Sequence, residues 1–196
     1  MSKVVRTSRF ALALAGASFA ATAAFAEPMV TIQTSMGDIV LELDHQHTPV
    51  TVDNFVRYAK EGHFDDTVFY RVVPGFVIQA GSLDAMGMPR GVYDPIPLET
   101  ANAQRNLRGT IAMGHGDDPN SAQAEFFINL ADQPTFDHQP DDMDNKTGYT
   151  AFGHVVTGME VVDAISKVPL GGGIGPFGDA APLMPVTIQK VTVSDN

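Results

Sequence analysis

Apolar and polar residues alternate along much of the chain, and this alternation predicts short β-strands. Residues 29–34 alternate, 35–38 carry the turn residues Ser-Met-Gly-Asp, and 39–43 return as a second apolar run, which together predict a hairpin. Further short apolar runs, bounded by glycine, proline or polar residues, occupy both sides of Pro74-Gly75 within 69–81, and 110–113, 126–130, 151–156 and 186–193.

Two segments have helical spacing instead. The first begins with Thr48 as N-cap and Pro49 at the first helical position, ends at Gly62, and has apolar residues at Val52, Phe55, Val56 and Ala59. The second covers 158–167, with Val161, Val162 and Ile165 on one face. Many short strands with two helices, and no repeated strand–helix alternation, predict a mainly β fold: an antiparallel barrel capped by helices.

The N-terminus has the pattern of a cleavable signal peptide. Lys3, Arg6 and Arg9 precede an apolar, alanine-rich run, and Ala24-Phe25-Ala26 fits the small-x-small cleavage rule. An uncleaved anchor is disfavoured because the apolar run is shorter than the ~20 residues of a spanning helix. We therefore expect a signal peptide at 1–26 and a single mature domain at 27–196, with irregular stretches at 82–108, 131–148 and 169–185.

Charge and cysteine content narrow the function. Cleavage would remove three of the twelve basic residues and none of the 23 acidic ones, which moves the formal net charge from -11 to -14. Such an acidic domain should be repelled by nucleic acids and anionic membranes, so neither is expected as a partner. The chain has no cysteine, which excludes thiolate catalysis and cysteine-based metal sites, and we expect no metal.

The segment 69–81 carries the clearest candidate chemistry. Two extended runs joined at Pro74-Gly75 can bring Arg71, Phe76 and Gln79 to one surface. A cation, an amide and an aromatic ring together suit a substrate that is mostly apolar but carries one carbonyl group.

This segment resembles the signature of the cyclophilin family of peptidyl-prolyl cis-trans isomerases. The stretch 109–113 followed by 125–129, and the stretch 149–155, resemble other parts of the same family pattern, in the same order and spacing. The resemblance runs from roughly Val30 to Val193. It implies a closed eight-stranded antiparallel barrel with a helix at each open end, and an enzyme that needs no cofactor.

The resemblance also assigns roles to individual residues. Arg71 matches the family's catalytic arginine, and Gln79 matches the residue that would bind the substrate backbone or hold the arginine. Phe76, Met113 and Phe127 match the wall of the proline pocket, and the resemblance favours this place, whereas the residue types alone would favour the barrel core. Val77 stands where many relatives have methionine, and Tyr149, which replaces a histidine of eukaryotic relatives, is expected to line the pocket.

Three further positions depart from the family pattern. Glu125 replaces a glutamine, and its carboxylate could pair with Arg71 or accept a substrate N–H. Gly114-His115 replaces an Ala-Asn pair that contacts substrate, so His115 either binds substrate or, as we favour, faces solvent from a turn. The chain has no tryptophan, and either Thr135 or Phe136 takes the position that holds cyclosporin in many relatives, so we expect weak cyclosporin binding.

Two functional hypotheses follow. The leading one is a periplasmic prolyl isomerase, secreted through its signal peptide, that acts on X-Pro bonds of unfolded or partly folded secreted proteins, as a monomer by family default. The alternative is a proline-peptide binding module or chaperone of the same fold with little or no catalysis, because an Arg71–Glu125 ion pair would weaken the hydrogen-bond donor. Restoring glutamine at 125 would raise activity several-fold only in the second case.

Overall fold

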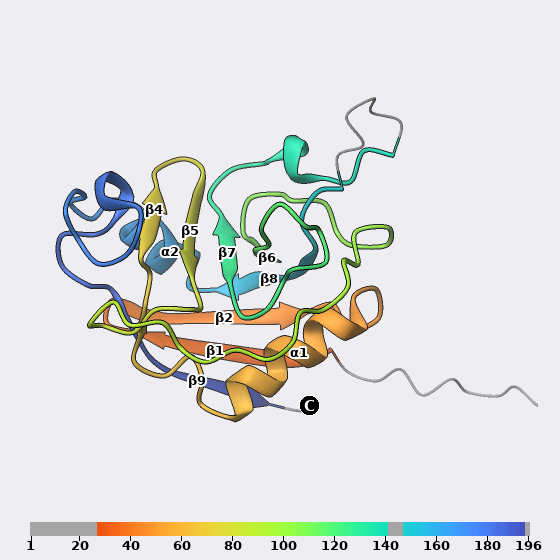
Figure 1. Cartoon of the computed structure of the whole chain (residues 1–196), viewed down its shortest axis with the longest axis horizontal. Coiled ribbons are helices and arrows are strands. Elements are labelled where there is room, and N and C mark those ends of the chain that lie inside the picture. Colours follow the sequence, from red (N-terminus) through yellow and green to blue (C-terminus); the bar gives the residue numbers. More distant parts are fainter. Residues whose placement is uncertain (1–26, 141–146, 195–196) are drawn as a thin grey trace, which may run out of the picture.

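The computed structural model describes residues 27–140 and 147–194, and in these residues one curled antiparallel sheet dominates (Figure 1). The predicted signal peptide lies outside the described residues. The hydrogen-bonded strand order is β3-β9-β1-β2-β8-β6-β7-β5-β4. The bounds of the strands are β1 Met29–Thr34, β2 Gly37–Leu43, β3 Thr67–Val68, β4 Arg71–Val73, β5 Val77–Ala80, β6 Thr110–Met113, β7 Phe126–Asn129, β8 Ala151–Thr157 and β9 Thr187–Ser194.

The two edges of this sheet are consecutive in the chain. β3 pairs with β9 at one edge and β4 pairs with β5 at the other, and only Phe69 and Tyr70 separate β3 from β4. The sheet must therefore curl until its edges meet. The count of nine strands, where eight are predicted, arises because one bent strand leaves the β9 ladder at Phe69 and joins the β5 ladder at Arg71.

The predicted hairpins are confirmed. β1 pairs with β2 from Met29↔Glu42 to Thr34↔Gly37. β4 and β5 pair around Pro74-Gly75, where Gly75 has φ +73°, a left-handed conformation that glycine adopts without strain. Arg71 lies directly opposite Gln79 in this hairpin.

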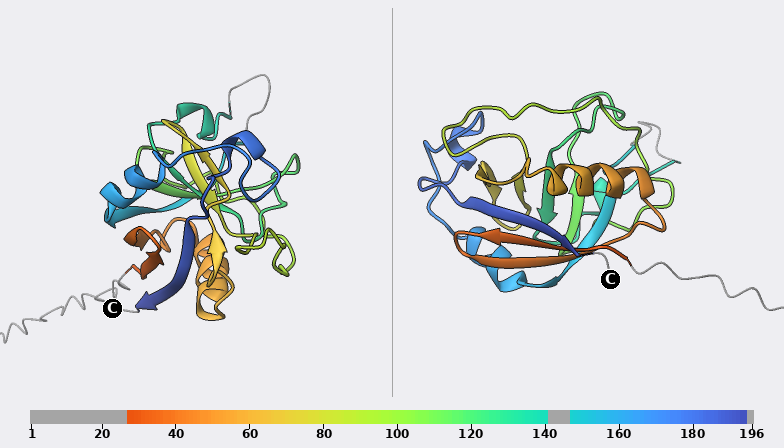
Figure 2. Two further views of the ribbon diagram at one scale, coloured as in Figure 1. Left: turned by 90° about the vertical axis from the view of Figure 1, so that its left-hand side faces the viewer. Right: turned by 90° about the horizontal axis from the view of Figure 1, so that it is seen from below.

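Both predicted helices are present, as α1 (Pro49–Lys60) and α2 (Met159–Ile165). α1 contacts β9 and α2 contacts β2 (Figure 2). Thr48 occupies the N-cap position of α1, but its hydroxyl donates to the Asp44 carbonyl oxygen at 2.8 Å and does not cap the helix. The Glu99 carboxylate caps it instead, accepting hydrogen bonds from the backbone N–H groups of Val50 at 3.2 Å and Thr51 at 2.7 Å. Neither helix in the described part of the chain is long and apolar enough to cross a membrane.

Strands β5, β6 and β7 bury side chains on both faces, and this creates two apolar clusters. Ile78, Ile111 and Ile128 point into the main core of the barrel. Alternate residues on the same strands, Val77, Ala112 and Phe127, join Ala151 in a smaller cluster on the opposite face. Phe76, Phe136 and Tyr149 pack against this smaller cluster and are only partly buried. Because successive side chains of a strand point to opposite faces, the same three strands contribute to the core and to a second apolar surface.

Candidate functional site

A cavity of about 420 Å³ lies over the smaller apolar cluster. Nine of the eleven residues that the sequence assigns to the site line it: Arg71, Val77, Gln79, Gly114, His115, Glu125, Phe127, Phe136 and Tyr149. Residues far apart in the sequence, on β4, β5, β7 and the loops beside them, therefore meet in one place.

The other two assigned residues lie beside or behind the cavity. Phe76, in the β4–β5 turn, packs edge-on against Phe136 with ring centroids 5.1 Å apart, and so supports the cavity wall. Met113 is 2% exposed and belongs to the main core, because it shares the inward face of β6 with Ile111.

The apolar side of the cavity consists of three aromatic rings. Phe136 lies 5.5 Å from Phe127 and 4.9 Å from Tyr149, and Phe127 lies 5.4 Å from Tyr149, all in edge-to-face arrangements. Of the two candidates for the cyclosporin-binding position, Phe136 thus lines the cavity, whereas Thr135 is exposed and is not part of the lining. Rings held edge-to-face offer a rigid apolar surface for a small ring such as that of proline.

The polar side is a chain of hydrogen bonds that begins at Arg71. Its Nη1 donates to Gln79 Oε1 at 3.0 Å, and this orients the guanidinium. Gln79 Nε2 donates to the Tyr70 hydroxyl oxygen at 2.8 Å and approaches Glu125 Oε2 at 3.4 Å. The Tyr70 hydroxyl in turn donates to Glu125 Oε2.

Glu125 therefore contacts groups other than Arg71. Its hydrogen-bond partners are Ser82, Tyr70 and Gln79, and burial raises the pKa of its carboxyl group above the ordinary value. Burial, followed by the charge and hydrogen bond of Glu125, also raises the pKa of Tyr70, so this phenol stays protonated and able to donate. The ion pair that would weaken Arg71 is not formed, and this removes the observation on which the alternative function rests.

His115 is half-buried and does not project freely from a turn. Its ring stacks on Tyr149 with centroids 4.5 Å apart, and its Nε2 lies 2.9 Å from the carbonyl oxygen of Gly148. The expectation of a solvent-facing histidine is wrong, because the loop after β6 folds back over Tyr149. His115 thus forms part of the cavity wall.

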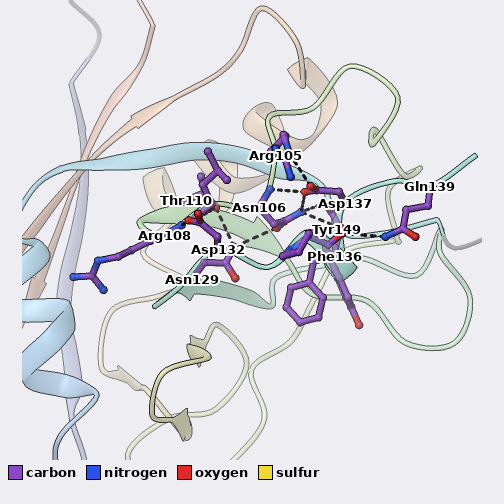
Figure 3. Close-up of polar contacts among 12 residues, drawn as sticks. Arg105, Asn106, Arg108, Thr110, Asn129, Asp132, Phe136, Asp137, Gln139 and Tyr149 are labelled. Atoms are coloured by element: carbon purple, nitrogen blue, oxygen red, sulfur yellow. Dashed lines mark hydrogen bonds and ion pairs between the residues drawn. The ribbon is translucent and has the colours of Figure 1, made fainter.

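Asn106 holds the backbone of two residues of the cavity wall, Phe136 and Tyr149 (Figure 3). Its side chain is 1% exposed, and its Nδ2 donates to the backbone carbonyl oxygens of Phe136 at 3.0 Å and Tyr149 at 3.1 Å. Its Oδ1 accepts a hydrogen bond from Asn129 Nδ2 at 3.2 Å. One amide group therefore fixes the backbone that carries two rings of the cavity.

Sequence reasoning missed six contributors to the site: Asn106, which supports the cavity wall, and five residues that line the cavity, Tyr70, Gly116, Ser121, Gln123 and Phe177. Tyr70 directly precedes Arg71, but alternation places it on the opposite face, and it reaches the cavity only because the strand bends there. Asn106 and Phe177 lie in irregular loops whose sequence has no period. A large aromatic residue in the glycine- and proline-rich segment 169–185 was the available signal for Phe177.

No cluster of three or more histidine, aspartate or glutamate side chains with metal-binding geometry occurs in residues 27–140 and 147–194. The described cavity includes the oriented guanidinium of Arg71, the amide of Gln79 and an apolar wall, on the outside of a curled antiparallel barrel. This combination has the chemistry to accommodate an apolar peptide segment with an exposed carbonyl or amide group.

Comparison with known proteins identifies the class. Residues 29–193 match the family model described as cyclophilin type peptidyl-prolyl cis-trans isomerase/CLD, and the chain belongs to this family. It is 41% identical over 173 residues to peptidyl-prolyl cis-trans isomerase A of Dickeya dadantii, covering 88% of each chain. It is 40% identical over 167 residues to peptidyl-prolyl cis-trans isomerase B of Escherichia coli, covering 85% of this chain and all of that one. The chain is thus an enzyme of the peptidyl-prolyl cis-trans isomerase class.

Solved structures support the fold. A cyclophilin type peptidyl-prolyl cis-trans isomerase of Cryptosporidium parvum, crystallised in the presence of the dipeptide Ala-Pro, matches with a TM-score of 0.68 at 21% identity. The match covers 86% of this chain and 99% of that protein. At this identity the likeness concerns the fold, and it agrees with the curled barrel described above.

Proposed function

We propose that this protein accelerates the cis–trans isomerisation of X-Pro bonds in unfolded or partly folded secreted proteins. The observation that supports this most directly is the position of Arg71. Its guanidinium is oriented by Gln79 in the same cavity as Val77, Phe127, Phe136 and Tyr149. A donor beside an apolar ring-binding wall is the arrangement that an X-Pro bond requires.

The chemistry needs no nucleophile and no proton carrier. Isomerisation must break amide resonance, with a barrier of ~18–20 kcal/mol, and in the twisted state the imide nitrogen regains a lone pair. Arg71 would donate a hydrogen bond to this nitrogen, which favours the twisted state over both planar forms. The guanidinium suits this role because it remains charged and carries several rigid N–H groups.

The aromatic wall supplies the second requirement. Phe127, Phe136 and Tyr149 would hold the proline ring still while the segment before it rotates. Gln79, whose Oε1 faces Arg71, keeps the donor aimed at the bond during this rotation. Binding to the proline ring alone would stabilise ground state and transition state equally, so the rate gain must come from Arg71.

We further propose that the protein works in the periplasm as a monomer. The sequence pattern at 1–26 supports export, because a basic start, an apolar run and Ala24-Phe25-Ala26 precede the family domain. Processing at Glu27 can be tested by N-terminal sequencing of protein recovered from the periplasmic fraction of an expressing cell. Light scattering of the same sample tests the monomeric state.

The catalytic proposal is tested by NMR exchange spectroscopy on a short peptide with one X-Pro bond. The wild type should make exchange much faster than the uncatalysed reaction, which takes tens of seconds or longer. Arg71→Ala should lose most of this acceleration while the peptide still binds. Arg57→Ala is the matched control, because Arg57 is an exposed arginine of α1 that does not line the cavity.

Peptide binding by wild type without faster exchange would refute the isomerase and leave a binding module. If wild type and Arg71→Ala accelerate exchange equally, the protein is still an isomerase, but Arg71 does not have the proposed role.

A further inference from the structure

Phe177 reaches the active-site cavity from a loop, 169–185, for which the sequence predicts only an irregular stretch. It is 43% exposed and lines the cavity. Its ring stacks on Tyr70, with centroids 6.0 Å apart and planes at 14°. The Arg71 Cζ lies 5.2 Å from the centroid of the same ring, within range of a cation–π interaction. These two contacts fix an exposed aromatic ring beside the proposed catalytic arginine.

The loop is organised so that it holds this ring in place. Backbone hydrogen bonds close it internally, from Gly171 N to Ala181 O at 2.9 Å and from Gly172 N to Gly178 O at 2.8 Å. The Phe177 carbonyl oxygen accepts from Ala180 N at 2.7 Å, and the short 3₁₀ turn η2 (Gly178–Ala180) contacts β4. The segment is therefore an ordered loop with its own hydrogen bonds, a type that often carries function.

Gly175 lets the loop lie directly on Tyr70. A Cβ atom at this position would lie 3.3 Å from Tyr70 Cβ and 3.1 Å from Leu83 Cδ1, and the backbone has φ +106°. A side chain here would require a backbone conformation that glycine adopts far more readily, and the loop or its neighbours Tyr70 and Leu83 would have to shift. The close approach at residue 175 and the stacking at residue 177 thus belong to one arrangement.

The loop that carries Phe177 lies beside β4, on the side away from β5 and β7 (Figure 1). Phe127, Gln79 and Arg71 are cross-strand neighbours on β7, β5 and β4, and β4 is the edge strand. Adjacent strands are about 4.8 Å apart, so Phe127 and Arg71 are separated by roughly 10 Å of sheet. Extended peptide advances about 3.3 Å per residue, so a residue two to four places from a bound proline would reach Phe177.

We propose that Phe177, stacked on Tyr70, forms the wall of a second apolar subsite, which holds a large apolar side chain of the substrate near the X-Pro bond. This inference rests on the proposed function, because it assumes a polypeptide with its proline against Phe127. The occupant is an aromatic or large aliphatic side chain of the kind that an unfolded protein exposes. Phe177 also restrains the Arg71 guanidinium through its ring face.

The test uses alanine-rich peptides with one Ala-Pro bond. A single phenylalanine is placed in turn at the second, third and fourth residue on either side of the proline. Exchange rate and dissociation constant are both measured by NMR for wild type, Phe177→Ala and Phe177→Leu. Met184→Ala is the matched control, because Met184 belongs to the same loop, is 79% exposed and does not line the cavity.

Wild type should favour phenylalanine over alanine about fivefold at one of these positions, which corresponds to about 1 kcal/mol. Phe177→Ala should reduce this preference below twofold. Phe177→Leu should keep part of it, because an apolar surface remains, while Met184→Ala keeps all of it. For peptides without phenylalanine, Phe177→Ala should lower the exchange rate less, and only because the contact between residue 177 and Arg71 has changed.

Two results would overturn the subsite. One is that the wild type shows no preference for phenylalanine at any flanking position. The other is that Phe177→Ala lowers the exchange rate and affinity equally for all peptides, with or without phenylalanine. Either result leaves the isomerase activity standing. Conversely, a phenylalanine-dependent affinity that Phe177→Ala removes, without faster exchange on any peptide, would refute the proposed function and keep the subsite.

Discussion

Replacing Asn106 by alanine should destabilise the protein and loosen the aromatic side of the active site. The substitution removes two hydrogen bonds from Nδ2, to the backbone carbonyl oxygens of Phe136 and Tyr149, and one hydrogen bond from Asn129 to Oδ1. A net value of about 1 kcal/mol for each gives a loss of about 3 kcal/mol. For a domain of this size the melting temperature should fall by roughly 6–12 °C.

Asn106→Asp is the sharper variant because it keeps the size of the side chain. A carboxylate oxygen would replace Nδ2 and face the two carbonyl oxygens, with Asp137 Oδ1, now 3.4 Å from Nδ2, close by. At neutral pH this variant should be at least as unstable as Asn106→Ala. The pKa of the new carboxyl group should rise on folding, so stability should return as the pH falls and the group becomes a donor.

Urea and thermal unfolding followed by circular dichroism measure both variants. Asn102→Ala, an exposed change in the same irregular stretch, should alter stability by no more than about 0.5 kcal/mol. A neutral-pH stability of Asn106→Asp close to wild type would refute the reasoning, because the site would then tolerate an acceptor where it needs a donor.

Further predictions concern three other residues. Burial raises the pKa of Glu125 in the folded state, so ionisation of this carboxyl group disfavours folding. The free energy of unfolding of the wild type should therefore fall relative to that of Glu125→Gln as the pH rises from the pKa of the unfolded state through the higher pKa of the folded state. Isomerase activity of Glu125→Gln should stay within about twofold of wild type, since a several-fold rise would show that Glu125 weakens Arg71. Glu99→Gln should cost about 1 kcal/mol in urea unfolding by weakening the cap of α1, and an unchanged midpoint would exclude this role. Cyclosporin should bind weakly in calorimetry, and Phe136→Trp should tighten binding because tryptophan adds an N–H donor on the cavity wall.

The elements of the fold were predictable because their signals are local. Alternation over a few residues predicts the β1–β2 hairpin, and Pro74-Gly75 predicts the β4–β5 turn that sets Arg71 opposite Gln79. The start of α1 was also predictable from Thr48-Pro49. The group that caps it was not, because Glu99 lies far along the chain and meets the helix only after folding.

The residues of the site also divide into those with a local sequence signal and those placed by tertiary contacts. Strand alternation was sufficient to place Met113 in the core, because it shares a face with Ile111, but the resemblance to the family outweighed it. Tyr70 needed knowledge of the bend between β3 and β4, which depends on the whole sheet. Phe177 needed the close approach of Gly175 to Tyr70, which is a tertiary contact with no periodic trace in the sequence.

The position of Glu125 shows why a departure from a family pattern must be judged with its neighbours. From the sequence alone, a carboxylate near Arg71 is expected to pair with the guanidinium and weaken it as a hydrogen-bond donor. In the structure Tyr70 donates to Glu125 and accepts from Gln79 Nε2, which leaves Gln79 Oε1 facing Arg71. Because a carboxylate can only accept, its charge sets the direction of the whole chain of hydrogen bonds. The residue that seemed to compete for the arginine instead fixes the amide that orients it.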